Sequence, residues 1–567
     1  MEIKHLRILN FRGIKELDWF LPGKYICLIG HGDSCKTTIL DAIEYALYPS
    51  YTLSFDDSDF YNCSTENPIV IFVSVSDCPA DFYEETKFGM YLRGIKDNKI
   101  IDEPEEGSIQ ILTIKLSVNK SLEPEWILFT DREMERKEIS HKMREKLSIL
   151  RVGNQIEKHF TWGKGSVLNK WSDNIDQARA MIADAVRKAK EGFDEDKIPD
   201  LQSIIEKISK TSEKFGIRPK TGYKAQLDTK SISFGYGAIS INDDKIPVRQ
   251  FGSGSKKLLA SGLQVESTNE GAILLFDEIE TGLEPYRLRN LIRVLKRELE
   301  SKGQIIATTH SSVALVEFDA ANIVIVRNNA GIINCQTLPT DIQKEFQGVF
   351  RKVPEAFFAK NVIVCEGATE YGFLLAFEEY LTGIGYDNFG YQGVTIVNGQ
   401  GDTLKQICKG LTSLGYNTCV IIDSDKIKKE EIEALRKSNI KVIIWNDQVS
   451  IEERIFLDVP KELIIETINL AYGLLSDEIG EEPARQSIID VINSKLHTSY
   501  STFNEIVEHS DITELRKDLG IVANDKKWFK KVYKGKCLGS LVFGSFDKIK
   551  STDIYSKMYD LIKWIYG

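Results

Sequence analysis

The sequence predicts an α/β protein with two series of parallel strands and a mainly helical C-terminal tail. Short apolar runs typical of buried strands recur along the chain, and helical patterns separate them. Strands and helices that alternate in this way form parallel sheets. The runs of the first series are 271–278, 304–310 and 322–328, and those of the second are 361–367, 394–399, 419–425 and 441–447. A helical connector at 340–358 separates the two series.

The composition and net charge of the chain exclude several classes of protein. Of the 567 residues, 42% are hydrophobic and 28% charged, as in folded proteins of about three to four domains. The net charge of −11 excludes a protein that is basic throughout, so nucleic acid would need a local basic patch. The sequence has no signal peptide or membrane-spanning pattern, and its nine scattered cysteines form no zinc-ligand cluster. We expect a cytoplasmic protein without membrane contact.

The N-terminal region combines strands with one amphipathic helix. Alternating residues at 3–9 predict a strand that leads into Asn-Phe-Arg-Gly at 10–13. The apolar run at 25–29 predicts a buried strand, and apolar spacing over 39–47 predicts a helix. Further strands of a partly antiparallel sheet are expected at 69–76, 109–118 and 125–131.

A glycine-containing loop lies between the strand at 25–29 and the following helix, which is the position of a phosphate-binding P-loop. Lys36 would contact the β and γ phosphates, and the Thr37 hydroxyl would ligate Mg²⁺. Cys35 replaces the glycine that normally precedes the lysine, and we expect it to fit only with a negative φ. An ordinary strand-to-helix turn is the alternative. The expected nucleotide-binding residues are Gly30, Gly32, Ser34, Cys35, Lys36, Thr37 and Thr38.

A second nucleotide motif follows the apolar strand 273–276. This strand ends in Asp277 and Glu278, which is the form of a Walker B motif. Asp277 would hold Mg²⁺ through water, and Glu278 would polarise the attacking water.

Two weaker segments complete the nucleotide site. His310 follows the strand 304–308, at the strand ends where sites in parallel sheets gather, although a lone histidine is more often structural. The turn at 251–257 opens a helix, and its Ser253 and Gly254 can present N–H groups to a phosphate.

In their order along the chain, these segments resemble the ABC-type ATPase heads of the RecF and SMC class. The resemblance implies that two heads enclose ATP, each offering its signature turn at 251–257 to the nucleotide of the other. It therefore implies a homodimer or a higher oligomer. Two amphipathic helices between 166 and 215 predict a helical insert that promotes dimerisation, or an ordinary helical pair within the same domain.

The second series of strands carries acidic residues at its strand ends. Glu366 follows the strand 361–365, and Glu370 lies one turn into the next helix, so both carboxylates can point to one spot. Asp423 and Asp425 lie on the same face at the end of a later strand. Carboxylates gathered in this way repel one another unless a cation is present. They predict a site for one or two divalent cations.

A further acidic pair, Glu452 and Glu453, opens the helix after the last strand, where carboxylates can also serve as helix caps. The EGxxE sequence, the DxD sequence and the later glutamate together resemble the TOPRIM fold. This is the metal-binding α/β domain of topoisomerases, primases and certain nucleases.

A lysine-rich segment at 526–536 is the clearest linear candidate for contact with DNA phosphates. Its lysines are interleaved with Trp528, Phe529 and Tyr533, which could stack on bases. The alternative is a solvated helix face with a buried aromatic edge.

An ABC-type ATPase with a helical insert, followed by a TOPRIM domain, resembles the OLD (overcoming lysogenization defect) family of ATP-dependent nucleases, which includes the nuclease subunit of the Gabija antiphage system. The resemblance implies an ATP-regulated DNA endonuclease that uses Mg²⁺ or Mn²⁺. It also implies a role in antiphage defence and a partner protein such as a helicase. A late lysine would offset charge on the phosphate, and Lys530 and Lys536 both fit. The implied metal-binding carboxylates are Glu366, Glu370, Asp423, Asp425 and Glu452.

The expected domains are an ATPase head at 1–165 and 216–340, a helical insert at 166–215, a TOPRIM domain at 358–460 and the rest of the nuclease region at 461–567. Two other functions fit parts of the sequence. One is an ATP-gated sensor or scaffold whose TOPRIM domain binds nucleic acid or a partner without cleaving. The other is a DNA topoisomerase, which would need a nucleophilic tyrosine in a cleavage domain that no segment identifies.

Overall fold

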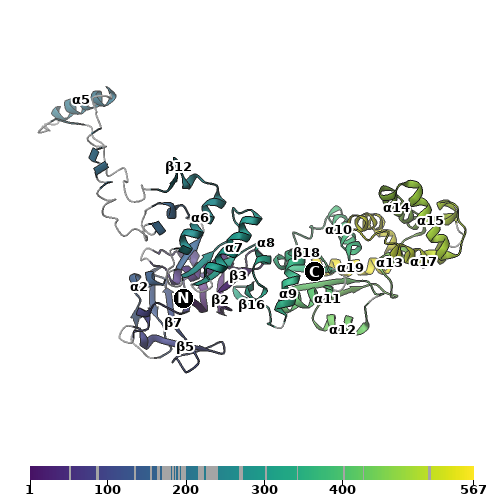
Figure 1. The fold of residues 1–567 in the computed structure, drawn as a ribbon, viewed down its shortest axis with the longest axis horizontal. Coiled ribbons are helices and arrows are strands. Elements are labelled where there is room, and N and C mark those ends of the chain that lie inside the picture. Colours follow the sequence, from purple (N-terminus) through teal and green to yellow (C-terminus); the bar gives the residue numbers. More distant parts are fainter. Residues whose placement is uncertain are drawn as a thin grey trace. The chain divides into compact units, whose positions relative to one another are not determined.

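The protein is described by a computed structural model (Figure 1). It describes residues 1–161 and 240–567 with short gaps, and within 162–239 it describes 166–168, 199–214, 222–224 and a few single positions. The gaps are 50–52, 85–87, 133–135, 148, 153–155, 267–271, 300–302, 341, 400–402, 426 and 509–511. The chain forms two compact units. Unit 1 comprises Met1–Ile26 and Thr37–Thr309, and unit 2 comprises Cys27–Lys36 and His310–Gly567.

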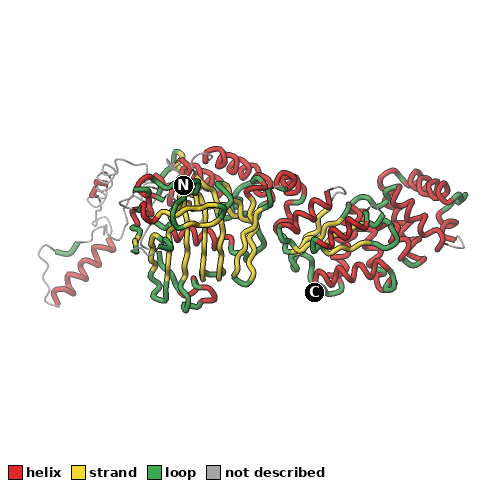
Figure 2. The backbone as a smooth tube through the Cα atoms, turned by 90° about the horizontal axis from the view of Figure 1, so that it is seen from below, coloured by secondary structure: helices red, strands yellow, loops and turns green. Residues whose placement is uncertain are grey.

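Antiparallel strands form one part of unit 1. β1 (Glu2–Phe11) pairs with β2 (Ile14–Phe20) and β4 (Ile69–Ser76), and β4 pairs with β7 (Ile109–Val118). The outer strands are β5 (Leu92–Lys96), β6 (Lys99–Ile101), β8 (Pro124–Leu128) and β9 (Lys137–Glu138). In Figure 2, yellow strands run side by side in the part of the chain that carries the N-terminus. The predicted partly antiparallel sheet is confirmed.

Parallel strands form the other part of unit 1. β13 (Ala272–Phe276) lies between β10 (Ile149–Val152) and β14 (Gly303–Thr308). All five side chains of β13 are buried, because a central parallel strand is covered on both faces. α6 (Ser253–Glu266) precedes β13, and α7 (Pro285–Leu299) connects β13 to β14. Asp277 and Glu278 therefore follow directly from a rigid, buried strand.

The helical insert is described in part. α5 (Pro199–Lys214) is present as predicted. Its apolar side chains Ile204 and Ile208 are 49% and 44% exposed. The first predicted insert helix, at 176–192, lies almost entirely outside the described residues.

Unit 2 contains the P-loop strand and its neighbours. β3 (Tyr25–Ile29) pairs in parallel with β15 (Ile323–Asn329), which pairs antiparallel with β16 (Ile332–Thr337). α1 (Lys36–Ala46) begins at the end of the P-loop. The predicted connector at 340–358 contains α9 (Gln343–Lys352), and α8 (Ser312–Glu317) precedes β15.

A second sheet in unit 2 has four parallel strands in the order β18-β17-β19-β20. Each strand is followed by a helix, as predicted. The strands are β17 (Asn361–Cys365), β18 (Val394–Asn398), β19 (Asn417–Ile422) and β20 (Lys441–Ile444). The helices are α10 (Ala368–Gly383), α11 (Leu404–Ser413), α12 (Lys429–Lys437) and α13 (Ile451–Asp458).

The tail is helical, which confirms the predicted fold class. Its helices are α14 (Lys461–Ile479), α15 (Glu481–Leu496), α16 (Phe503–Glu508), α17 (Ile512–Asp525), α18 (Val532–Phe543) and α19 (Asp553–Tyr566). The tail shares one hydrophobic core with the four-stranded sheet. Within the described residues, no helix has the length and apolarity needed to span a bilayer.

α18 packs on α10 at very close range, because glycines line the contact. A Cβ atom on Gly372 would lie 2.0 Å from the carbonyl oxygen of Val532, and one on Gly535 would lie 2.4 Å from that of Thr369. No larger residue fits at these positions without moving a helix. The contact fixes the segment that precedes α18 against the start of α10.

Candidate nucleotide and metal sites

Lys36 lies at the centre of the P-loop in unit 2. Its Nζ donates hydrogen bonds to Gly30 O, His31 O and Ser34 Oγ, each at 3.0 Å. Gly30 has a φ of +152°, and a Cβ there would lie 2.4 Å from the carbonyl oxygen of Val326. The loop thus curls around the lysine ammonium, in the arrangement that presents a cation to phosphate oxygens.

The backbone conformation at Cys35 differs from the one expected from the sequence. Its φ is +67°, so the position keeps the left-handed conformation for which glycine is normally selected, and the expected negative φ is wrong. This conformation costs a residue with a side chain about 1–2 kcal/mol. The amide of Asn328 donates to Cys35 Sγ at 3.3 Å and to the carbonyl oxygen of Asp33 at 3.4 Å. These contacts help to hold the strained loop.

Replacing Cys35 with glycine is expected to raise the free energy of unfolding by about 1 kcal/mol, because glycine removes the side-chain strain at positive φ. Urea denaturation followed by circular dichroism measures this change. Cys35→Ala is the matched control, since it removes the thiol and keeps the strain. Equal stability of the glycine and alanine variants would contradict the strained conformation.

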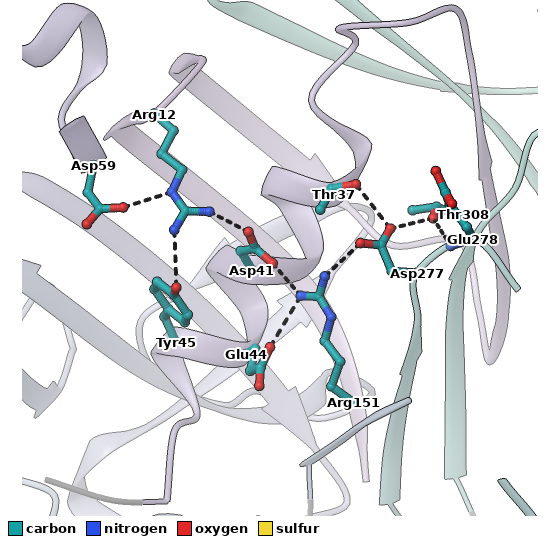
Figure 3. Close-up of polar contacts among 10 residues, drawn as sticks. All are labelled: Arg12, Thr37, Asp41, Glu44, Tyr45, Asp59, Arg151, Asp277, Glu278 and Thr308. Carbon is teal, nitrogen blue, oxygen red and sulfur yellow. Dashed lines mark hydrogen bonds and ion pairs between the residues drawn. The ribbon is translucent and has the colours of Figure 1, made fainter. Parts of the chain in front are cut away.

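Asp277 is surrounded by hydrogen-bond donors in unit 1 (Figure 3). Its Oδ1 accepts from Thr37 Oγ1 at 3.0 Å and from Thr308 Oγ1 at 2.8 Å, and its Oδ2 accepts from Arg151 at 2.9 Å. The Walker B carboxylate is therefore held beside the P-loop threonine, as the two motifs predict. Both residues offer oxygen ligands that suit Mg²⁺.

A chain of ion pairs extends this network to the N-terminal strand. Arg151 also pairs with Asp41 and Glu44, and Asp41 pairs with Arg12 (Figure 3). Arg12 in turn pairs with Asp59 at 2.8 Å. Sequence reasoning missed Arg151. Its signal was a single charged residue inside an otherwise apolar strand, which predicts a buried ionic contact but does not identify its partner.

Glu278 follows Asp277 with a φ of +44°, a conformation that is uncommon for a residue with a side chain. Its backbone N–H donates to Thr308 Oγ1 at 2.8 Å, and its Oε2 accepts from Thr281 Oγ1 at 3.1 Å. The side chain is exposed, so its carboxylate can reach a water molecule.

The signature turn and the strand-end histidine lie where the sequence predicts them. Ser253 is exposed at the start of α6. Gly254 is buried, and its backbone approaches Gly282 so closely that a Cβ there would lie 2.3 Å from the carbonyl oxygen of Gly282. In unit 2, His310 is exposed, and its ring lies 6.4 Å from that of Phe358. In the P-loop, Gly32 is exposed and Thr38 is half-buried. Nucleotide binding by these residues stays a prediction.

Buried carboxylates gather in unit 2 at the ends of β17 and β19. Glu370, Asp423 and Glu452 are at most 2% exposed. The backbone N–H of Asp423 donates to Glu366 Oε2 at 3.2 Å, which links the two strand ends. Trp445 Nε1 donates to Asp423 Oδ1 at 3.1 Å. The structure thus brings four of the five predicted carboxylates into one region.

Burial, and after it repulsion between carboxylates, raises the pKa of two members of this acidic cluster. Burial and then the neighbouring charge of Glu452 raise the pKa of Glu370 to about 7. Burial and then the charge of Glu370 raise the pKa of Asp423 well above its usual value. A divalent cation would relieve this repulsion.

Lys530 is the cation in the cluster. Its Nζ lies 3.3 Å from Glu452 Oε1. Burial alone would lower its pKa, but the charges of Glu452, Glu370 and Asp423 raise it above the usual value, so the lysine is protonated. Lys536 instead pairs with exposed Glu379 at 2.5 Å. The structure therefore separates two lysines that the sequence left equivalent.

Asp425 and Glu453 lie at the edge of the cluster. Asp425 is exposed, and its charge contributes, after burial, to the raised pKa of Glu453. The backbone N–H of Glu453 donates to Ser450 Oγ at 3.3 Å, so Ser450 caps α13. The cap is therefore a serine hydroxyl and not the Glu453 carboxylate, whereas Glu452 is buried beside Lys530 in the cluster.

The carboxylate oxygens suit a hard divalent cation by their chemistry. In the described part of the chain, however, no three His, Cys, Asp or Glu side chains converge as metal ligands. Metal binding would therefore draw the carboxylates closer together. Which of them ligate a metal stays a prediction.

Glu370 is expected to make stability depend on pH when metal is chelated. Its pKa is about 7 in the folded protein against an ordinary 4.5. The stabilisation is therefore fully present below pH 4.5 and is lost as the pH rises through 7. Denaturation between pH 5 and 8 in chelator should show wild type losing roughly 3 kcal/mol relative to Glu370→Gln. Glu379→Gln, at an exposed position, is the control and should follow wild type. Parallel profiles for wild type and Glu370→Gln would contradict a raised pKa.

Two of the three aromatic residues in the lysine-rich segment 526–536 are not available to stack on bases. Trp528 and Phe529 are buried in the core, so the expectation that they stack on bases is wrong. Lys531 and Lys534 both pair with Glu478, at 2.7 and 3.0 Å. Much of the local positive charge is thus neutralised within the chain, as the solvated-face alternative predicts. Tyr533 is 48% exposed.

Two parts of the chain match models of known domain families. Residues 1–314 match the family model of an AAA ATPase domain, and residues 357–425 match that of an overcoming lysogenization defect protein-like TOPRIM domain. Domains of these kinds generally use a nucleotide and a divalent metal.

Two named proteins are similar in sequence. The chain is 24% identical to the Old nuclease of Escherichia phage P2 over 407 residues, which are 65% of this chain and 66% of that protein. It is 30% identical over 102 residues to the phosphate import ATP-binding protein PstB 1 of Streptococcus mutans serotype c, which are 16% of this chain and 40% of that protein. Both matches span less than two thirds of the relative's length.

Solved SMC head domains show a weaker likeness. One is bound to the C-winged helix domain of ScpA (16% identity, TM-score 0.34, 60% of this chain and 99% of that chain). Another, with an extended coiled coil, is bound to the C-terminal domain of ScpA from Pyrococcus furiosus (15% identity, TM-score 0.34, 62% and 99%). The AAA ATPase model covers more than half of the chain, so the chain belongs to that family, and a TOPRIM domain follows; the TOPRIM match and the Old nuclease support its recognition as an overcoming lysogenization defect (OLD) family protein.

Proposed function

We propose that this protein is an ATP-regulated, metal-dependent DNA endonuclease that acts in the cytoplasm in antiphage defence. The observation that carries the proposal is the contact of Lys530 with Glu452 at 3.3 Å among the buried carboxylates Glu370, Asp423 and Glu452. A cluster of this kind can hold divalent cations and a phosphodiester at once. The nine free cysteines agree with a reducing compartment.

The residues of the acidic cluster have distinct roles in this proposal. Glu366, Glu370, Asp423, Asp425 and Glu452 would hold Mg²⁺ or Mn²⁺. When bound, the metal supplies a hydroxide nucleophile and stabilises the leaving oxygen. Lys530 offsets negative charge on the phosphate in the transition state, and Glu452 holds its ammonium in place.

The ATPase residues would bind and hydrolyse ATP to control cleavage. Lys36 binds the β and γ phosphates, Thr37 and Asp277 hold Mg²⁺, and Glu278 orients the attacking water. Control needs only a difference in ATP affinity between two conformations. Slow turnover is sufficient for such control.

Association of two copies would complete the ATPase sites. Each signature turn, with Ser253 and Gly254, would contact the nucleotide of the other copy. The exposed Ile204 and Ile208 on α5 offer an apolar stripe for a second contact between copies. A helicase is the kind of partner protein that the proposed role suggests.

Nicking of supercoiled plasmid DNA tests the proposal. The purified protein should convert plasmid to open circles or linear DNA with Mg²⁺ or Mn²⁺ and should be inactive with chelator, because the carboxylates need a bound cation for catalysis. A second candidate function is an ATP-gated sensor or scaffold that binds DNA without cleaving it. Metal-dependent DNA binding without nicking would support it.

A further inference from the structure

Lys257 joins the helix of the signature turn to the Walker B glutamate. It lies on α6, one turn after Gly254, and is only 4% exposed. Its Nζ donates a hydrogen bond to the backbone carbonyl of Glu278 at 2.7 Å. A lysine ammonium is rarely buried without such a partner. The hydrogen bond to the Glu278 carbonyl therefore compensates for the burial of the Lys257 ammonium.

Both backbone polar groups of Glu278 are held by side chains from other elements. Thr308, at the end of β14, accepts from its N–H at 2.8 Å, and Lys257 donates to its carbonyl. These contacts support a residue with a φ of +44°, a conformation that persists only when its surroundings hold it. The direction of the Glu278 side chain depends on this backbone conformation.

The same helix contacts the segment after Glu278 at its N-terminal end. A Cβ on Gly254 would lie 2.3 Å from Gly282 O, and a Cβ on Gly282 would lie 2.9 Å from Ser253 Oγ. The signature helix is thus in contact with both ends of the segment 278–282. A shift of this helix would move the backbone of Glu278 through Lys257.

We propose that Lys257 is a positioning residue: it fixes the backbone of Glu278 so that the carboxylate faces the attacking water, and it links the place of the signature turn to that alignment. The inference deepens the proposed ATPase function and rests on it. Lys257 touches no reacting atom and acts through Glu278.

Lys257→Met tests this role, because methionine keeps most of the side-chain volume and cannot donate a hydrogen bond. Lys257→Gln, whose amide can still donate, provides a second variant. Arg297→Met is the control: Arg297 is an exposed cation on α7, outside the signature turn, and it pairs with the neighbouring Glu298 at 3.0 Å.

Hydrogen–deuterium exchange without nucleotide measures the position of the backbone directly. In Lys257→Met, the amides of 277–283 should exchange faster than in wild type, because the backbone of Glu278 loses one of the two side chains that hold it. Arg297→Met should match wild type, and Lys257→Gln should lie between wild type and Lys257→Met. Unchanged exchange in Lys257→Met would overturn the proposal.

Steady-state ATP hydrolysis measures the consequence. For Lys257→Met we expect kcat to fall about tenfold, or about 1.4 kcal/mol in activation free energy, with KM and binding of a fluorescent ATP analogue unchanged. A loss of ATP binding, or an equal fall of kcat in Arg297→Met, would overturn the positioning role. If wild type hydrolyses no ATP, the proposed ATPase function fails, while the exchange result still decides whether Lys257 holds Glu278.

Discussion

Lys530→Met and Asp423→Asn are each expected to reduce metal-dependent plasmid nicking by about a thousandfold or more, which corresponds to about 4 kcal/mol of transition-state stabilisation. Lys530 supplies positive charge in a buried site, where charge has a large effect. Asp423 supplies a carboxylate for the cation, and asparagine keeps an oxygen that can accept from Trp445 Nε1, so the fold should persist. Initial rates of nicking at fixed Mg²⁺ or Mn²⁺ measure the effect.

Lys536→Met is the matched control for the lysine. Lys536 lies six positions beyond Lys530, but its partner is the exposed Glu379, so its loss should leave nicking near the wild-type rate. Circular dichroism should show that all three variants are folded. Loss of nicking in Lys536→Met but not in Lys530→Met would assign the catalytic role to the other lysine. Full activity of Asp423→Asn would place the active site elsewhere.

Lys36→Ala and Glu278→Gln are expected to have opposite effects on nicking. Lys36→Ala removes the ammonium that would bind ATP, and it also removes three hydrogen bonds inside the loop. Glu278→Gln should keep ATP bound and slow its hydrolysis about a hundredfold or more, because the water loses its polarising carboxylate. One variant therefore prevents the ATP-bound state, and the other prolongs it.

Nicking with and without ATP, together with phosphate release, measures these effects. Glu284→Gln is the control, because this glutamate lies six positions after Glu278, just before α7, and pairs with Arg287 at 3.2 Å. It should behave like wild type. If Lys36→Ala and Glu278→Gln both match wild type with and without ATP, nucleotide does not control the nuclease.

Sequence reasoning identified features whose signal is local. The P-loop at 30–37 and the acidic ends of the strands at 361–365 and 419–422 lie within short segments, because a buried strand followed by a turn places its functional residues directly at the strand end. The order of these motifs was sufficient to predict two α/β sheets and a helical tail.

Features that depend on packing between distant segments escaped sequence reasoning. The sequence could not separate Lys530 from Lys536, because the contact of Lys530 with Glu452 is made across the helix packing around Gly535. Arg151 carries no motif, and its role depends on Asp41 and Asp277. The conformation of Cys35 was predicted wrongly because the shape of the loop determines φ there, despite the strain on a residue with a side chain.

The close packing of α18 on α10 has a consequence during synthesis of the protein. Lys530 leaves the ribosome 107 residues after Asp423 (530 minus 423), which is roughly 5–20 s later at ordinary elongation rates. In the folded protein it lies beside Glu452, in the segment just before the glycine-lined contact at Gly535. A nascent or prematurely terminated chain would therefore carry the ATPase motifs and the carboxylates without the lysine. If cleavage requires Lys530, such fragments leave the DNA of their own cell intact.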